Sequence, residues 1–407
     1  MAKIALIFPT SACGRTIDQS RVYEDARGLT GSEVAFWETS RRLLTLGHDV
    51  TTFGNFKFRL TNALPDSEWP DYADDPWDTV VSYVHPEPLR LCNPNVRRVF
   101  VQQCNDFAAC PDDWTLFTDY LVAPGRMLLR HLLSQTNFPP SYARVFHNGH
   151  ALEPDSSIKR VPGRLLWASS HDRGLHWALQ VFQQLRKTFV DPETREVFPP
   201  LELELHVAYN QTGMDEMAKI PDDASPVWVR ELGRRSRYCK SVLPKLEEQG
   251  VRVLGSVSRD QMVREMQEAE ILLYPCDPVN WTEGFSNTTC EAMALGCLPV
   301  LIFSDAFQDL WKGAVPGVDP LDVYAADGSR HPTARFLLRE KQYISLVRSL
   351  LTGLTANGLD ITQWRKRAAE RASHFHWDKQ VNSFAEFLCG NDAALPGPDM
   401  TYPWEGK

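Results

Sequence analysis

The stretch Glu270–Phe303, EILLYPCDPVNWTEGFSNTTCEAMALGCLPVLIF, decides the fold. Its two short apolar runs, Ile271–Tyr274 and Leu298–Phe303, are rich in leucine and β-branched residues and are bounded by polar residues, glycine or proline, which predicts two buried strands. The segment TTCEAMALG between them favours a helix that ends at Gly296. A strand, a helix and a second strand form a βαβ unit, so we expect a parallel sheet with ligands at the carboxyl ends of its strands.

The loop before this helix contains residues that suit a binding site for an anion. Gly284 allows a close backbone approach, and Ser286, Asn287 and Thr288 are all suited to cap a helix. The free N–H groups and the helix dipole at such an N-terminus favour an anion, most often a phosphate. We therefore expect the backbone of residues 284–288 to hold a phosphate group.

Two carboxylates, Glu283 and Glu291, flank this predicted anion site. If both were helical, eight residues would separate them by roughly 12 Å, at about 1.5 Å per residue. The two carboxylates of a glycosidase lie about 5–9.5 Å apart, so we do not interpret this pair as a glycosidase acid and nucleophile. Carboxylates also accept hydrogen bonds from sugar hydroxyls. We expect one of them to face a sugar and the other a ribose, on opposite sides of the phosphate.

The pattern EGFSNTTCE followed by AMALGCLPV resembles the E-x7-E signature of the glycosyl transferases group 1 family, whose members are retaining enzymes with the GT-B fold. The resemblance implies that Glu283 contacts the donor sugar and that Glu291 binds the nucleotide ribose. The backbone between them would hold the diphosphate, namely at Gly284, Phe285, Ser286, Asn287 and Thr288. A glutamate at each end of a helix is also common surface decoration, but the attached loop, helix and strand favour the functional interpretation.

Composition sets the broad class. With 407 residues, 43% apolar and 23% charged, the chain is expected to be a soluble globular protein of two domains. A net charge of −9 argues against general binding to nucleic acid or anionic membranes, although it leaves room for a local basic patch. The nine cysteines form no C-x-x-C pair, which predicts reduced thiols and a cytoplasmic location. No signal peptide and no run of roughly 20 apolar residues is present.

Residues 1–152 are expected to form the first Rossmann-like domain, on the acceptor side. Lys3–Phe8 predicts a buried strand, and a polar loop over residues 9–30 has a length typical of functional loops. Gly31 and Ser32 then open an amphipathic helix, so the order is that of a Rossmann-like half. In the family a G-G/S-x-E turn touches the donor phosphate, and the resemblance gives this role to Gly31 and Ser32. The alternative is that both residues only cap the helix.

Polar residues at the ends of the following strands are expected to point into the cleft. The family often carries a histidine there, near the reacting sugar. Asn105, followed by Asp106, occupies the matching position, so Asn105 is a candidate catalytic residue. His85, at the end of the neighbouring predicted strand, is the alternative, although a lone histidine is more often structural. The sequence does not decide between Asn105 and His85.

Residues 153–372 are expected to form the second Rossmann-like domain, which binds the nucleotide sugar. Its first predicted strand leads into the loop SSHDRG at residues 169–174. A cation in such a loop neutralises the charge that develops on a departing diphosphate. Compared with the family pattern R-(x)n-K-G, Arg173 stands at the lysine position and the upstream arginine is missing. The nearest alternative cation in this loop is His171.

Other segments complete the prediction. Tyr209 follows a predicted strand and is expected near the nucleotide, and Val257 lies in a GSVS turn that resembles the family's turn beside the base. The basic run RELGRRSRYCK at residues 230–240 has three interpretations: a solvated helix face, a clamp on a phosphorylated or nucleic-acid acceptor, or a partner surface. Residues 373–407 are expected to form a helix that crosses back to the first domain, and an irregular tail.

Together these features predict an α/β chain with two Rossmann-like domains facing across a cleft, and a retaining glycosyltransferase that uses a nucleoside-diphosphate sugar. The acceptor, whether saccharide, small molecule or nucleic acid, and the oligomeric state are not predicted. No Asp-x-Asp metal motif follows a predicted strand, so no metal or other cofactor is expected, and Arg173 with backbone amides would replace one. Two alternatives stay open: a transferase whose acceptor is nucleic acid or a phosphorylated lipid, and a nucleotide-binding protein of the same fold without activity.

Overall fold

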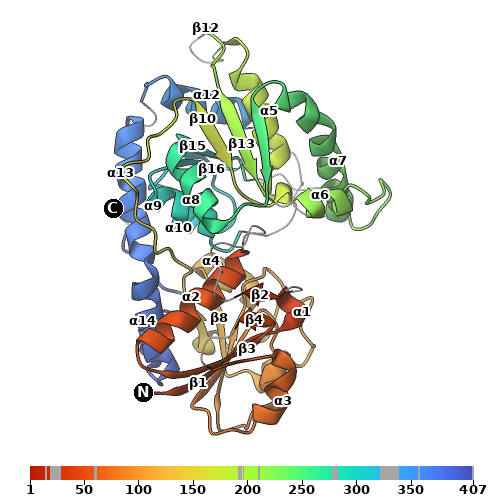
Figure 1. The fold of residues 1–407 in the computed structure, drawn as a ribbon, viewed down its shortest axis with the longest axis vertical. Coiled ribbons are helices and arrows are strands. Elements are labelled where there is room, and N and C mark those ends of the chain that lie inside the picture. Colours follow the sequence, from red (N-terminus) through yellow and green to blue (C-terminus); the bar gives the residue numbers. More distant parts are fainter. Residues whose placement is uncertain are drawn as a thin grey trace.

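The computed structural model describes residues 1–13, 16–18, 29–58, 62–190, 195, 197–209, 211–276, 283–320, 339–355 and 358–405. Over these residues the chain forms two α/β domains, one above the other in Figure 1. Each domain is built on a parallel sheet, as the βαβ pattern predicts.

In the first domain the described residues form a seven-stranded sheet in the order β5-β3-β1-β6-β7-β8-β9. Its strands are β1 (Lys3–Phe8), β3 (Asp49–Gly54), β5 (Ala63–Leu64), β6 (Thr79–Tyr83), β7 (Arg97–Val101), β8 (Tyr120–Ala123) and β9 (Ala143–Val145). Successive side chains of a strand point to opposite faces. In β1, Ile4 and Leu6 therefore enter one core, and Ala5 and Ile7 enter the core on the other face.

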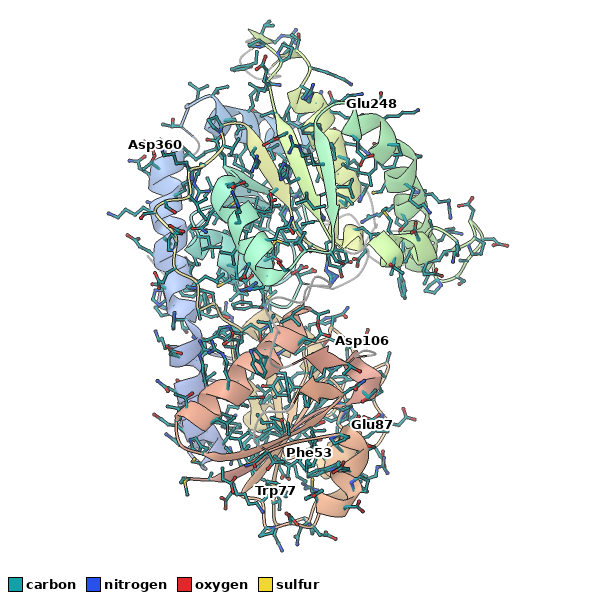
Figure 2. All side chains as sticks on the ribbon, in the orientation of Figure 1. Phe53, Trp77, Glu87, Asp106, Glu248 and Asp360 are labelled. Carbon is teal, nitrogen blue, oxygen red and sulfur yellow. The ribbon has the colours of Figure 1, made fainter. Side chains whose placement is uncertain are left out.

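Helices and aromatic side chains cover both faces of this sheet. Phe53 and Trp77, labelled in Figure 2, meet edge to face on one of them, with ring centroids 6.3 Å apart. The helices of this domain are α1 (Thr10–Cys13), α2 (Gly31–Thr45), α3 (Trp69–Tyr72) and α4 (Arg126–Leu133), and a small parallel pair joins β2 (Ile17–Asp18) to β4 (Phe56–Phe58).

The second domain repeats the plan, and its described residues form a six-stranded sheet in the order β14-β13-β10-β15-β16-β17. The strands are β10 (Arg164–Trp167), β13 (Glu204–Ala208), β14 (Val251–Gly255), β15 (Ile271–Tyr274), β16 (Leu298–Ile302) and β17 (Gly317–Val318), and β11 (Phe189–Val190) and β12 (Val197–Phe198) form a separate antiparallel pair. The helices are α5 (Leu175–Leu185), α6 (Gln211–Met217), α7 (Val227–Glu247), α8 (Arg259–Glu268), α9 (Asn287–Ala294), α10 (Phe307–Leu310), α12 (Glu340–Leu351) and α13 (Ile361–Ala372). In the described part of the chain, no helix combines the length and the apolar character needed to span a bilayer.

The strand order explains where two of the predicted catalytic residues, Arg173 and Glu283, lie. It reverses between β1 and β6 in the first sheet and between β10 and β15 in the second. In open α/β sheets, ligands bind beside the carboxyl ends of the strands at such a reversal. The segments that follow β10 and β15 lead to Arg173 and Glu283, so both side chains arise where the topology favours a ligand.

The last long helix, α14 (Trp377–Leu388), belongs to the core of the first domain. Trp377 and Phe384 pack with residues of β1 and α2, and Phe384 stacks on Phe146 with ring centroids 4.1 Å apart. Figure 1 shows α13 and α14 running along one side of both domains. This confirms the predicted helix that crosses back to the first domain.

Among its described residues, the tail after α14 has one short 3₁₀ helix, Asp392–Ala394, and it is packed against both domains. Tyr402 and Trp404 stack with ring centroids 4.7 Å apart, and Trp404 Nε1 donates to the Asp309 carbonyl oxygen at 3.0 Å. Arg126, at the start of α4, reaches Asp309 Oδ2 at 3.1 Å and also pairs with Glu405. The tail therefore ties α4 of the first domain to α10 of the second.

Arg126→Ala is expected to lower the free energy of unfolding by about 3 kcal/mol, because it leaves the buried Asp309 carboxylate without its ion-pair partner. The Asp309 side chain is only 2% exposed, and burial already raises its pKa. Arg130→Ala is the matched control, because the ion pair of Arg130 with Asp399 is exposed and should contribute at most about 1 kcal/mol. Chemical denaturation measures the free energy of unfolding of both variants, and an equal loss of stability in the two would contradict the role given to Arg126.

Candidate active site

A cavity of about 600 Å³ opens between the two domains and is called the interdomain cavity below. Residues of both domains line it, including the start of α2 from the first and the start of α9 from the second. The predicted site residues that line it are Gly31, Ser32, Arg173, Tyr209, Val257, Glu283, Gly284, Phe285, Ser286, Asn287, Thr288 and Glu291.

The first helix that begins at the cavity is α2. Its N-cap is Thr30, whose Oγ1 accepts from the Glu33 backbone N–H at 3.4 Å, while the Thr30 N–H donates to Glu33 Oε2 at 2.7 Å. This is a capping box, in which the cap and the third helical residue satisfy each other's backbone groups. Gly31 and Ser32 are therefore the first two helical residues, directly after the cap, and their contact with a donor phosphate stays a prediction.

The second helix that begins there is α9. Its N-cap is Ser286, which has a φ of +65° and accepts from the Thr289 N–H at 3.3 Å. Asn287 Nδ2 donates to the Gly31 carbonyl oxygen at 3.3 Å, so the two helix starts touch across the domains. Each start carries unpaired N–H groups and the positive end of a helix dipole. Their convergence makes this wall of the cavity suited to an anion.

Gly284 explains how closely the domains approach at this point. A Cβ on Gly284 would lie 2.5 Å from Leu128 Cδ2, and a Cβ on Gly125 would lie 2.6 Å from the Gly284 carbonyl oxygen. The close approach predicted at Gly284 is thus made by α4 of the first domain. Any larger residue at either glycine would push Gly284 and α4 apart.

Glu283 is held at the cavity by two donors. Its Oε1 accepts from Arg173 Nε at 2.8 Å and from the Tyr274 hydroxyl at 2.8 Å, and Tyr274 lies 2.8 Å from Ser169 Oγ. Burial raises the pKa of Glu283, and the Arg173 guanidinium opposes that shift. An ion pair with a guanidinium and a hydroxyl on the same oxygen fixes the carboxylate in one orientation.

Arg173 connects this carboxylate to a second one. Its Nη1 lies 3.2 Å from Asp172 Oδ2, in the loop that follows β10. Burial works against the charge of Arg173, but Asp172 and Glu283 outweigh it and raise the pKa of the guanidinium. Arg173 therefore carries a permanent positive charge on the cavity wall.

Arg259 is a cavity residue that the sequence analysis did not single out. It is the first residue of α8 and forms a two-bond ion pair with Glu291, with Nη1–Oε2 at 2.6 Å and Nη2–Oε1 at 2.5 Å. Its position directly after the GSVS turn was the available signal, because that turn was already expected to border the nucleotide. Each predicted glutamate therefore has its own arginine.

Asn105 is not among the residues that line the cavity. Strand β7 ends at Val101, so Gln103 and Cys104 come to the cavity wall first. The Asn105 carbonyl oxygen accepts from Gln135 Nε2 at 3.0 Å, in the loop marked by the label of Asp106 in Figure 2. Gln103 stands at the cavity wall instead and pairs with Asn148 through two amide hydrogen bonds of 3.1 and 3.3 Å, and the catalytic role of Asn105 stays a prediction.

The two candidate histidines also lie outside the lining of the cavity. His85 Nδ1 is 2.7 Å from Ser11 Oγ. His171 is 4% exposed, and neither of its ring nitrogens has a hydrogen-bond partner within the described part of the chain. Burial lowers the pKa of His171, so its ring is neutral near pH 7. His171, the nearest alternative cation in the sequence, therefore does not supply a charge to the cavity wall in this structure.

His147 is a buried histidine at the domain junction, and we expect it to make the stability of the fold depend on pH. It is buried, its Nδ1 lies 2.8 Å from the Pro124 carbonyl oxygen, and its ring contacts Phe285 and Tyr402. Burial lowers the pKa of His147 to about 4. The unfolded chain binds this proton near pH 6.5, so stability is complete above that pH. We expect it to fall between pH 6.5 and 4 by up to about 1.4 kcal/mol per pH unit.

Chemical denaturation between pH 6.5 and 4.5 measures this effect. His147→Gln keeps an N–H donor for the Pro124 carbonyl but does not titrate, so its unfolding free energy should change less steeply with pH than that of the wild type. Equal slopes would contradict the assignment to His147.

The basic run lies on α7, and acidic neighbours pair with several of its members. Glu231 accepts from Arg234 Nε at 2.8 Å and from Arg235 Nε at 2.9 Å. Lys240 pairs with Asp215 of α6 at 2.6 Å. These pairs offset much of the positive charge, which favours the interpretation as a helix face over that of an anion clamp.

Over the part of the chain that the structure describes, no three His, Cys, Asp or Glu side chains are grouped as a metal site. The cysteines with described side chains are free thiols, and most are buried.

Known structures share this architecture over nearly the whole chain. Sucrose-phosphate synthase from Thermosynechococcus elongatus matches with a TM-score of 0.61 and 11% identity, covering 97% of this chain and 100% of its own. AviGT4, a glycosyltransferase involved in avilamycin A biosynthesis, matches with a TM-score of 0.55 and 14% identity, covering 96% and 99%. The chain has the GT-B fold. Anabaena HepE, whose structure contains UDP and glucose, shares it with a TM-score of 0.57 and 11% identity, covering 96% and 100%.

In addition to the structural matches, a family model matches part of the sequence. The family model of the glycosyl transferases group 1 matches residues 214–320, a segment that contains Arg259, Glu283 and Glu291. No curated protein sequence matches the chain. The structural matches share only 11–14% of their residues with this chain, so they show a common fold and nothing more specific.

Proposed function

We propose that the protein is a retaining glycosyltransferase that moves a sugar from a nucleoside-diphosphate sugar to an acceptor hydroxyl without a metal ion. The observation that carries this proposal is the wall of the interdomain cavity: a helix N-terminus suited to an anion, flanked by two glutamates that are each paired with an arginine. A diphosphate with a sugar at one end and a ribose at the other matches this order of groups.

The donor would lie along α9. Backbone N–H groups at the starts of α9 and α2 would receive the diphosphate. Glu283 would accept hydrogen bonds from the sugar hydroxyls and Glu291 from the ribose. Because Arg173 and Tyr274 already occupy Glu283 Oε1, we assign Glu283 to orienting the sugar rather than to forming a covalent bond with it.

Arg173 would act on the leaving group. As the sugar–phosphate bond breaks, negative charge develops on the diphosphate, and a fixed cation in a partly buried site stabilises it. In this proposal Arg173 and the helix starts supply the positive charge that a metal ion supplies elsewhere. The acceptor hydroxyl would approach from the first domain, where Gln103 and Asn148 present neutral amides.

The test is the release of nucleoside diphosphate from UDP-, GDP-, ADP- and TDP-sugars, with and without EDTA. UDP-glucose comes first because HepE, of the same fold, was crystallised with UDP and glucose. Release that survives EDTA and is lost in Glu283→Gln would support the proposal, and the anomeric configuration of the product tests retention. If no donor is turned over and no nucleotide raises the melting temperature, the proposal is overturned.

One alternative has its own signature in this experiment. A GT-B protein that binds a nucleotide without catalysis would be stabilised by one nucleoside diphosphate but would release none from the matching sugar donor, whatever acceptor is supplied. A nucleic-acid or phosphorylated-lipid acceptor is less favoured, because acidic residues pair with the basic run that suggested it.

A further inference from the structure

Arg259 and Glu291 form a two-bond ion pair in the interdomain cavity, and the proposed reaction gives a role to Glu291 but none to Arg259. The Arg259 side chain is 17% exposed and that of Glu291 is 4% exposed. Their two parallel N–H···O bonds, at 2.6 and 2.5 Å, engage both oxygens of the carboxylate. Such a fork fixes the plane of a carboxylate as well as its charge.

The backbone holds the guanidinium in place. Arg259 begins α8, whose N-cap Ser258 accepts from the Gln261 N–H at 3.3 Å. Gly255, at the end of β14, has a φ of +68°, which turns the chain toward the cavity before α8 starts. Because Arg259 comes from α8 and Glu291 from α9, the pair links two elements of the same cavity wall.

Charge explains why a glutamate at this place needs an arginine. The described residues that line the cavity include the glutamates Glu33, Glu283 and Glu291 and the arginines Arg173 and Arg259. Without Arg259, three carboxylates would face one cation, and a diphosphate would meet strong repulsion in a poorly solvated site. Glu33 is already engaged by the Thr30 N–H, and Glu283 by Arg173. Arg259 is the cation that offsets Glu291.

We propose that Arg259 is a positioning residue for the nucleoside end of the donor: it fixes the Glu291 carboxylate so that it accepts a ribose hydroxyl, and it offsets that carboxylate's charge beside the diphosphate. This inference rests on the proposed function. The guanidinium acts through Glu291, so removing Arg259 should weaken nucleotide binding while changing the chemical step little.

The experiment measures the dissociation constant of UDP, and of GDP, ADP and TDP, by calorimetry on the full chain. Arg259→Ala is expected to weaken binding of the preferred nucleotide roughly 10- to 100-fold, the range for losing a charge-assisted hydrogen-bond pair. Arg259→Lys, which keeps the positive charge but not the two parallel hydrogen bonds, should bind the nucleotide more weakly than the wild type and more tightly than Arg259→Ala. Arg264→Ala is the matched control, because Arg264 lies on the same helix in an exposed pair with Glu268, and it should bind like the wild type.

A double-mutant cycle separates positioning from a general structural role. If Arg259 acts through Glu291, adding Arg259→Ala to Glu291→Gln should weaken binding by less than about threefold beyond Glu291→Gln alone. In the active enzyme, Arg259→Ala should raise KM and leave kcat within about threefold of the wild type. Binding losses that multiply in the double variant would overturn the inference.

The outcomes for the two proposals differ. If the wild type binds none of the four nucleotides, the proposed function fails, and this inference with it. If the wild type binds one of them and Arg259→Ala binds it equally well, the inference alone is overturned and the proposed function stands. If Arg259→Ala fails to fold, the same comparison is made with Arg259→Lys, where unchanged binding and unchanged KM would overturn the inference.

Discussion

Turnover of the donor is expected to fall by roughly 100- to 1,000-fold when Glu283 is replaced by glutamine or alanine, the range for removing a preorganised electrostatic contact at a reacting centre. The carboxylate lies beside Arg173 and Tyr274 at the reversal point of the second sheet. Glutamine keeps the size of the side chain but loses its charge and places a donor where acceptors are needed. Initial rates at saturating donor measure the effect.

Glu291 provides the contrast for this prediction. Glu291→Ala removes the proposed ribose contact, so KM for the donor should rise while kcat changes much less. Both variants should keep the wild-type circular dichroism spectrum, because each glutamate lies at the cavity and not in a hydrophobic core. Wild-type activity in both variants would remove the assignment of the two glutamates.

The fold could be predicted well where local sequence and tertiary structure agree. The strand Ile271–Tyr274 has the predicted bounds, and Leu298–Ile302 differs from its prediction by one residue. A short apolar run that is flanked by glycine, proline and polar residues can bury its side chains in few ways other than as a strand of a sheet. The same logic identified the loop before α9, because a glycine and several capping residues before a helix are a local signal.

Features set by distant contacts were harder to predict. The partner of Arg259 is 32 residues away in sequence, and an arginine at the start of a helix looks like an ordinary surface residue. Asn105 matches the position at which the family often carries a histidine, but β7 ends at Val101, and Gln103 and Cys104 line the cavity there. The sequence predicted only an irregular tail, but the large aromatic rings of Tyr402 and Trp404 stack and pack at the junction of the two domains.

Arg173→Ala is expected to reduce turnover about 100-fold, because the developing charge on the leaving diphosphate loses its fixed cation. It also leaves the Glu283 carboxylate buried without its ion-pair partner. Burial already raises the pKa of Glu283 and Arg173 opposes that shift, so the variant should raise this pKa further. Its residual activity should therefore increase with pH over a range that lies at higher pH than in the wild type.

The same change should have the opposite effect on stability. A carboxyl whose pKa is higher in the folded state stabilises the fold below its unfolded pKa, and this contribution is lost as pH rises through the folded pKa. Relative to the wild type, Arg173→Ala should thus lose stability with rising pH while its activity increases. Arg173→Lys keeps the charge, and the family pattern that this loop resembles has lysine there, so it should recover part of the activity and the wild-type pH profile. A flat activity profile in Arg173→Ala would show that Arg173 does not control the charge of Glu283.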